Sequence, residues 1–181
     1  IYGSPTLRGS YMVGRVGGGG FLPTAALQYQ HFYTPRLLSG FEGSLGMAAV
    51  CEIPGGSGNE RFGIEAGVIH NRARYEDRLG QDRDGWRINM VWQQNLGRGT
   101  ASFQYTHSEL DDETGYSPLF DNGVSRSESL NSLNLRYIYP LDSFIANANI
   151  VAWVSYYDQR SSVALFRTRG TVAEITLNWA F

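Results

Sequence analysis

Apolar and polar residues alternate along most of the chain, and a period of two is typical of β-strands whose two faces differ. The pattern is clearest at the C-terminal end, where one face collects Ala173, Ile175, Leu177, Trp179 and Phe181. Comparable alternation recurs in about eight segments, at residues 24–33, 41–51, 62–68, 86–93, 102–106, 133–139, 143–157 and 171–181. Because no helical period of comparable length occurs, the chain is predicted to be all-β.

The connections between these predicted strands alternate in length. Long polar connections cover residues 72–85, 109–128 and 158–169, and short ones cover 54–59, 95–99 and 140–142. A short turn at Thr34–Pro35–Arg36 is the exception, since a long connection is expected there. Most strands are near the ~10 residues of a tilted membrane strand, and long outer loops with short periplasmic turns are typical of membrane barrels. The pattern therefore predicts an antiparallel transmembrane up-and-down β-barrel of about eight strands over residues 22–181.

The N-terminal segment, residues 1–21, leaves alternatives open. Tyr11, Val13 and Arg15 alternate and could form a further strand before the glycines at 17–20. Because bacterial single-chain barrels have an even number of strands, a ninth strand would make the chain the C-terminal part of a larger barrel. If the segment is instead periplasmic or a plug, residues 22–181 close as an eight-stranded barrel, which is the slightly preferred alternative.

The composition fits this class and excludes others. The 181 residues are 42% hydrophobic and 18% charged, with 22 glycines and a mean hydropathy of -0.28. A membrane helix needs about 18 consecutive apolar residues and none is found, whereas a barrel strand meets lipid with only every second residue. The net charge of -2 argues against a nucleic-acid partner. Without a starting Met or a signal peptide, the chain is interpreted as a mature exported protein or a piece of a longer one.

The inward register of the predicted barrel collects five charged residues, Glu42, Glu65, Arg87, Arg136 and Glu174. The interior of an eight-stranded barrel is just filled by side chains, so these charges would have to pair as a structural network. In a wider barrel the same residues would be the polar lining of a water-filled channel.

The predicted outer loops are rich in charge and can be interpreted as solvated segments, or as a surface that recognises a ligand or a divalent cation. Asp111–Asp112–Glu113 lacks the spaced ligands and internal glycine of an EF-hand loop, so no metal site is expected. The residues assigned to these loops are Arg72, Arg74, Asp77, Asp111, Asp112, Tyr116, Asp121 and Arg160.

Enzymatic chemistry is not expected from the sequence. The histidines His31, His70 and His107 fall on the lipid-facing register near strand ends, where a catalytic base would be misplaced. The single cysteine, Cys51, excludes an internal disulfide framework. No catalytic residue, metal or cofactor is predicted, and the tyrosines and tryptophans at strand ends indicate an interfacial aromatic girdle.

Two resemblances add to this pattern. The alternating C-terminal strand with its terminal aromatic resembles the closing strand of bacterial outer-membrane β-barrels. That resemblance implies that Trp179 and Phe181 are recognised by the outer-membrane assembly machinery of a Gram-negative bacterium. It also implies a bilayer of lipopolysaccharide and phospholipid around the protein. The segments 115–123 and 159–169 resemble the last loops of surface lipoprotein assembly modulators and related secretion porins with tetratricopeptide-repeat domains.

The second resemblance implies the passage or display of a cargo, with a protein cargo or a periplasmic partner. The leading functional hypothesis is therefore a translocation or secretion pore component in the outer membrane. The first alternative is a small closed barrel that serves as a membrane anchor, adhesin or structural partner through its outer loops. A weaker alternative is a soluble lipocalin-like barrel, in which Leu177, Trp179 and Phe181 would face an internal cavity and bind an apolar ligand.

Overall fold

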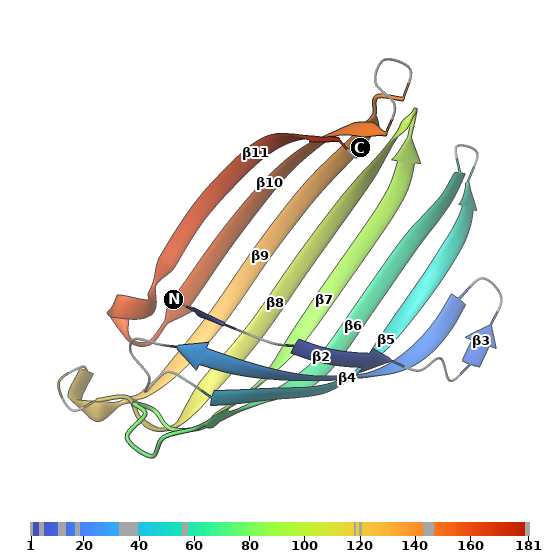
Figure 1. Cartoon of the computed structure of the whole chain (residues 1–181). Coiled ribbons are helices and arrows are strands. Elements are labelled where there is room, and N and C mark those ends of the chain that lie inside the picture. Colours follow the sequence, from blue (N-terminus) through green and yellow to red (C-terminus); the bar gives the residue numbers. More distant parts are fainter. Residues whose placement is uncertain are drawn as a thin grey trace.

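Eight long strands, β4 to β11, follow one another along the chain, and each pairs antiparallel with the next (Figure 1). The structure is a computed structural model that describes residues 2–3, 6–10, 14–16, 19–32, 40–55, 58–117, 119, 121–142 and 147–179. The long strands are β4 (Gly19–Phe32), β5 (Gly40–Gly55), β6 (Gly58–Ala73), β7 (Arg83–Leu96), β8 (Gly99–Gly115), β9 (Ser125–Pro140), β10 (Ala148–Ser161) and β11 (Thr168–Trp179). The predicted all-β, antiparallel, up-and-down architecture is thus confirmed, and so is the number of long strands.

The N-terminal segment contributes three short strands that all pair antiparallel with β4. They are β1 (Tyr2–Gly3), β2 (Thr6–Ser10) and β3 (Gly14–Val16). The described parts of this segment therefore lie along the edge of the sheet, and β4 begins at Gly19, before the expected boundary at residue 22. Arg15 lies in β3, whereas Tyr11 and Val13 lie outside the described residues.

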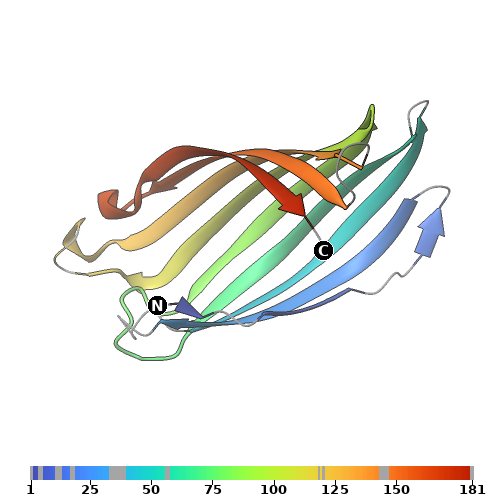
Figure 2. The ribbon, with the colours of Figure 1, turned by 45° about the horizontal axis from the view of Figure 1, so that its top comes forward.

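The sheet is curved like a trough, and its two edges stay apart (Figure 2). The order of strands runs from β1 and β4 through to β11, and no ladder between described residues joins β11 back to the other edge. The preferred expectation that residues 22–181 close as eight strands is therefore not met by the described pairing. Closure depends on contacts between distant strands, and a period of two in the sequence does not specify them.

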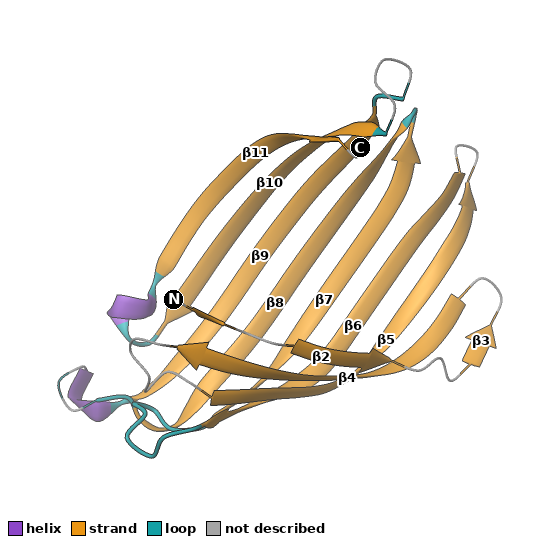
Figure 3. Cartoon of the chain, viewed as in Figure 1, coloured by secondary structure: helices purple, strands orange, loops and turns teal. Residues whose placement is uncertain are grey.

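Most strands are longer than the hydrophobic pattern predicts, and the long connections are correspondingly shorter (Figure 3). The exception is the segment predicted at 143–157, because β10 begins at Ala148 and residues 143–146 lie outside the described residues. The predicted loops 72–85, 109–128 and 158–169 shrink to 74–82, 116–124 and 162–167. Polar residues do not interrupt a ladder, because backbone hydrogen bonds form whatever the side chains are. The assignment of Arg72, Asp111, Asp112 and Arg160 to loops was therefore wrong, since they lie in β6, β8 and β10.

The remaining residues assigned to outer loops lie in connections. Arg74 and Asp77 follow β6, Tyr116 follows β8, and Asp121 begins the short 3-10 helix η2 (Asp121–Gly123). A second 3-10 helix, η3 (Ala164–Phe166), lies between β10 and β11. These connections share one end of the sheet, called here the loop end. The opposite end, where Gly97 and Arg98 join β7 to β8, is called the turn end. Thr34–Pro35–Arg36 lies outside the described residues.

Little of the chain is buried in a core. Among the described residues only Ile69, Ala148, Val151 and Val163 are buried apolar side chains, whereas large apolar residues such as Leu45 and Ile175 are 66% and 78% exposed. No helix in the described ranges is long and apolar enough to span a membrane. The fold is thus one curved sheet with two open faces, and its functional surfaces are those two faces and the loop end.

Candidate functional site

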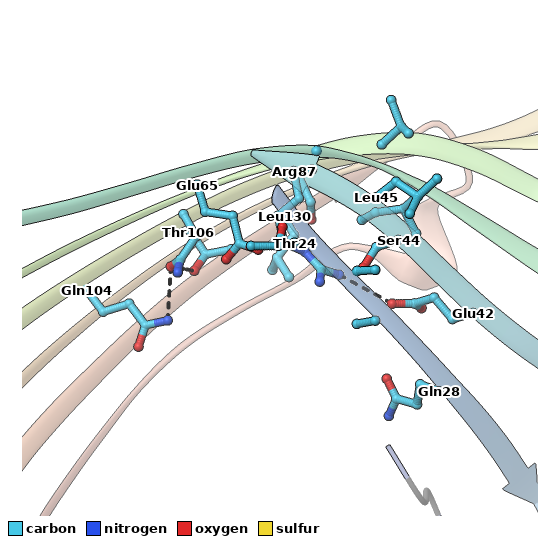
Figure 4. Close-up of a pocket in the computed structure, with 18 residues that line it drawn as sticks. Thr24, Gln28, Glu42, Ser44, Leu45, Glu65, Arg87, Gln104, Thr106 and Leu130 are labelled. Atoms are coloured by element: carbon cyan, nitrogen blue, oxygen red, sulfur yellow. Dashed lines mark hydrogen bonds and ion pairs between the residues drawn. The ribbon is translucent and has the colours of Figure 1, made fainter. Parts of the chain in front are cut away.

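The inner, concave face of the sheet is polar and forms a hollow. Cross-strand neighbours share a face, and the ladder places Glu65, Asn89, Thr106 and Ser132 in one row across β6 to β9. Figure 4 shows Glu65, Thr106 and other polar side chains on the inside of the curve, around a cavity of about 410 Å³. The alternation seen in the sequence therefore produces a continuous polar surface rather than isolated polar residues.

Hydrogen bonds connect this surface. Gln104 donates from Nε2 to Asn89 Oδ1 at 3.0 Å, and the Thr106 hydroxyl donates to the same oxygen at 3.1 Å. Closer to the loop end, Arg87 Nη2 lies 3.6 Å from Glu42 Oε1 (Figure 4). Asn71 Nδ2 donates to Glu42 Oε2 at 3.5 Å. Neutral side chains are thus hydrogen-bonded to one another in the centre of the hollow, and the ion pair of Glu42 and Arg87 lies to one side of this centre.

The five charged residues predicted for the inner register fall into two separate groups. Glu42, Glu65 and Arg87 line the cavity, and of these Glu42 and Arg87 form an ion pair. Arg136 and Glu174 lie near the turn end, in a row with Trp153 between them. The Glu174 carboxylate accepts a hydrogen bond from Thr176 Oγ1 at 2.7 Å. The described structure does not bring all five residues together into one network.

A buried cluster of charges at the loop end was missed by the sequence analysis. The side chain of Asp112 has no exposed area, and its Oδ1 lies 2.9 Å from Arg83 Nε and 3.0 Å from Arg126 Nη2. Glu128 joins the same group, because Arg83 Nη2 donates to its Oε2 and Arg126 Nε lies 3.6 Å from its Oε1. These four residues, called here the buried ion cluster, come from β7, β8 and β9.

The loop between β6 and β7 closes over the buried ion cluster. Arg78 is 9% exposed and donates from Nη1 to Asn71 Oδ1 at 2.6 Å. Burial lowers the pKa of the Arg78 guanidinium, and the nearby cations Arg83 and Arg126 lower it further. Gly80 has a φ of 80° and lies against the Asp112 carboxylate, where a side chain would collide. The backbone at this point therefore needs a glycine.

Two aromatic rings, one from each of the two other described loops, pack against the buried ion cluster. The Arg126 guanidinium lies 4.8 Å from the ring centre of Tyr116 and 4.5 Å from that of Phe166, within the range of cation–π attraction. The two rings meet edge to face at 5.0 Å. One arginine therefore links the loop after β8 with the loop after β10, while the ion cluster links both to the loop after β6.

The convex face carries an apolar band that crosses the hydrogen-bonded rows obliquely. One row is apolar on β5 to β7 and polar on β8 to β10: Leu45, Val68, Trp86, Glu109, Ser129 and Arg160. A row nearer the turn end is apolar throughout: Phe62, Trp92, Phe103, Leu135, Val154 and Ala173.

A third row, still closer to the turn end, has the opposite order. It is polar at Gln94 on β7 and apolar on β8 to β11, at Ala101, Tyr137, Ala152 and Ile175. Glu60 on β6 accepts a hydrogen bond from Gln94 Nε2 at 2.6 Å. The apolar band therefore moves toward the turn end from β5 to β11.

Two histidines, His70 and His107, lie on or near the polar borders of this band. His70 Nδ1 lies 2.5 Å from Asp84 Oδ1, and His107 Nδ1 lies 2.8 Å from Asn131 Oδ1. His107 also packs against Trp86, with ring centres 4.9 Å apart. In the described part of the chain, no group of three His, Cys, Asp or Glu residues is arranged to hold a metal ion.

Of the two residues predicted as an assembly signal, the structure describes Trp179. Trp179 is the last residue of β11, pairs with Ala148 and is 55% exposed, while Phe181 lies outside the described residues. Comparisons with models of protein families, with curated proteins and with solved structures found no significant match. The functional argument therefore rests on the two faces and the loop end.

Proposed function

We propose that the chain forms the wall of an outer-membrane β-barrel and contributes to a translocation or secretion pore, with its concave face along the path of the cargo. The oblique apolar band on the convex face is the observation that supports this proposal. Membrane barrel strands tilt by about 35–45°, so a level apolar belt must cross the hydrogen-bonded rows at an angle. A soluble sheet packed on a core has no reason for such a slope.

The energetics of the exposed side chains support the same proposal. Leu45, Met47 and Val68 on β5 and β6, with Ile175 and Leu177 on β11, are each more than half exposed on the convex face. Removing such a side chain from water is worth about 1.5–3 kcal/mol, and large contiguous apolar patches mark contact surfaces. Lipid chains would cover the whole band. The lipocalin-like alternative would need Leu177 on the concave side instead.

A pore is favoured over a closed anchor because the described sheet stays open along its two edges. A closed eight-stranded barrel has an interior just wide enough for its side chains, whereas here a cavity of about 410 Å³, lined by polar and apolar residues, lies inside the curve. The alternative of an anchor or adhesin has its own support in the loop end, where buried charges and stacked rings fix the loops as a rigid surface. We propose no catalytic activity for either alternative.

Two tryptophans offer a direct test of the membrane assignment. Trp92 lies on the convex face and Trp153 on the concave face. Variants that keep one of these as the only tryptophan, folded into vesicles with brominated lipid, should differ in fluorescence. Lipid bromine should quench Trp92 strongly and leave Trp153 bright. Equal quenching, or stronger quenching of Trp153, would contradict the proposal.

Conductance separates the pore from the anchor. Purified chain in a planar bilayer should give steady currents whose ion selectivity changes in Glu65→Lys, because Glu65 lines the hollow. Glu60→Lys makes the same charge change on the convex side and should leave selectivity unchanged. A silent bilayer with folded protein, shown by heat-modifiable gel mobility, would rule out a pore formed by this chain alone and favour the anchor.

A further inference from the structure

Across β7 to β10 the middle of the concave face bears neutral side chains, most of which are amides and hydroxyls. Across β7 to β10 two neighbouring rows place together six such residues, named here the neutral polar track: Asn89, Gln104, Thr106, Ser132, Asn134 and Ser155. Four strands at about 4.8 Å spacing make the track about 14 Å wide. Val91 is the apolar residue within these two rows, and none of the six residues has a formal charge.

Formal charges border the track instead, and one of them, Glu65 on β6, lies beside Asn89 in the same row. Toward the loop end lie Arg87, with its partner Glu42, and then the buried ion cluster. Toward the turn end lie Arg136 and Glu174. Between these borders a charged chain would lose water over the six neutral residues without gaining a counter-charge from them, and such desolvation is costly. The track therefore disfavours polyanions and polycations alike.

Each group of the track can both donate and accept hydrogen bonds, as a sugar hydroxyl can. The hydrogen bonds within the track show donors and acceptors of this kind, since Asn89 Oδ1 accepts from both Gln104 and Thr106. Two aromatic residues adjoin the track on β10 of the same face, Tyr157 and Trp153. Their rings combine an apolar body with a polar edge, which suits a ligand with both C–H and hydroxyl surfaces.

We infer that the concave face passes a neutral, hydroxyl-rich chain, an uncharged oligo- or polysaccharide, over the neutral polar track. This inference rests on the proposed function, because it assumes that the concave face lines the path of a cargo. A polypeptide is the competing class. A mixed polypeptide presents charged and apolar side chains, and the track offers neither counter-charges nor an apolar cleft for them.

The test uses the full chain in lipid nanodiscs with Trp153 as the only tryptophan. Three probes of similar length are added: maltoheptaose, an oligogalacturonate and a neutral Gly/Ser peptide. Maltoheptaose should shift Trp153 fluorescence at a concentration on the order of tenfold lower than the other two require. No response to maltoheptaose, or an equal or stronger response to the acidic sugar or the peptide, would overturn the inference.

Matched variants locate the binding surface. Asn134→Leu removes hydrogen bonds from the track and should weaken maltoheptaose binding about threefold to tenfold. Asn131→Leu makes the same change on the opposite face of β9, where Asn131 accepts from Tyr105, and should leave binding unchanged. Ser155→Ala is the milder second variant if Asn134→Leu fails to fold. Equal effects of the two asparagine substitutions would overturn the assignment to the track.

Quenching by brominated lipid distinguishes the two possible failures. If lipid quenches Trp153, the concave face meets the membrane and the proposed function itself fails. If Trp153 stays unquenched while maltoheptaose has no effect, the proposed function stands and the neutral hydroxyl-rich cargo is excluded.

Discussion

At the scale of single residues, neighbours on one strand have opposite environments. Asp111 and Asp112 follow each other on β8, but Asp111 is exposed on the convex face while Asp112 has no exposed side-chain area. Asp112 contacts two arginines, and its Oδ2 has no hydrogen-bond partner among the described residues. The fold therefore depends on one of these two carboxylates far more than on the other.

We expect Asp112→Asn to lower the free energy of unfolding by about 3–5 kcal/mol, because it leaves Arg83 and Arg126 buried with too little counter-charge. Asp111→Asn is the matched control and should change stability by no more than about 0.5 kcal/mol. Urea titrations of protein folded in phospholipid vesicles, followed by tryptophan fluorescence, measure both. Similar losses in the two variants would contradict the proposed importance of the buried ion cluster.

The alternation in the sequence could predict which residues share a face of the sheet, but not which side chains they contact there. Alternation assigns Glu42, Glu65 and Arg87 to one face, and they line one cavity. It also gives Arg126 and Glu128 a common face, which was a usable signal for a charge pair. The partners of Asp112 come from β7 and β9, and such cross-strand contacts depend on register, which composition leaves open.

A second prediction at this scale concerns Phe181. We expect Phe181→Ser to reduce the amount of protein in the outer membrane, because the terminal aromatic resembles an assembly signal. Its effect on folded stability should stay within about 1 kcal/mol. Phe62→Ser, on the convex face, is the control and should mainly affect stability. Normal outer-membrane levels of Phe181→Ser would contradict a role of Phe181 in assembly.

At the scale of elements, ladders extend beyond the apolar pattern and support the loops. β8 has 17 residues and continues through Glu109 to Gly115, with an irregular register between Asp111 and Gly115. The loop after β6 attaches to this extension, since Glu113 N donates to Asp82 O at 2.9 Å and Thr114 N to Gly80 O at 3.4 Å. The sequence predicted the strands but not these extensions, because their polar residues resemble loop sequence.

Arg126 is expected to hold the loops after β8 and β10 together. Arg126→Lys retains the charge but loses the planar guanidinium that packs on Tyr116 and Phe166. We expect a loss of about 1–2 kcal/mol in loop closure, and hence about fivefold to thirtyfold faster chymotrypsin cleavage near Leu165 and Phe166. Arg160→Lys is the control, because that side chain is 78% exposed. Unchanged cleavage in Arg126→Lys would contradict the link.

At the scale of the whole molecule, the two edges of the sheet determine how a barrel can close. β2 and β11 run in the same direction, because β2 is antiparallel to β4 and seven antiparallel pairings separate β4 from β11. Direct closure between them would be parallel, whereas bacterial barrels close antiparallel with an even strand count. Antiparallel closure therefore needs either the removal of β1 to β3 from the edge of β4 or an odd number of further strands.

The open edge leads to a prediction for hydrogen exchange. In lipid every backbone polar group needs a partner, yet each residue of β11 pairs only with β10 among the described residues. In the isolated chain in detergent micelles, half of the β11 amides, those that point away from β10, should exchange on the order of tenfold faster than amides of β7 and β8. The alternate β11 amides that bond to β10 are the internal control and should stay protected. Residue-resolved exchange measures both sets, and uniform protection along β11 would show that this chain closes its own barrel.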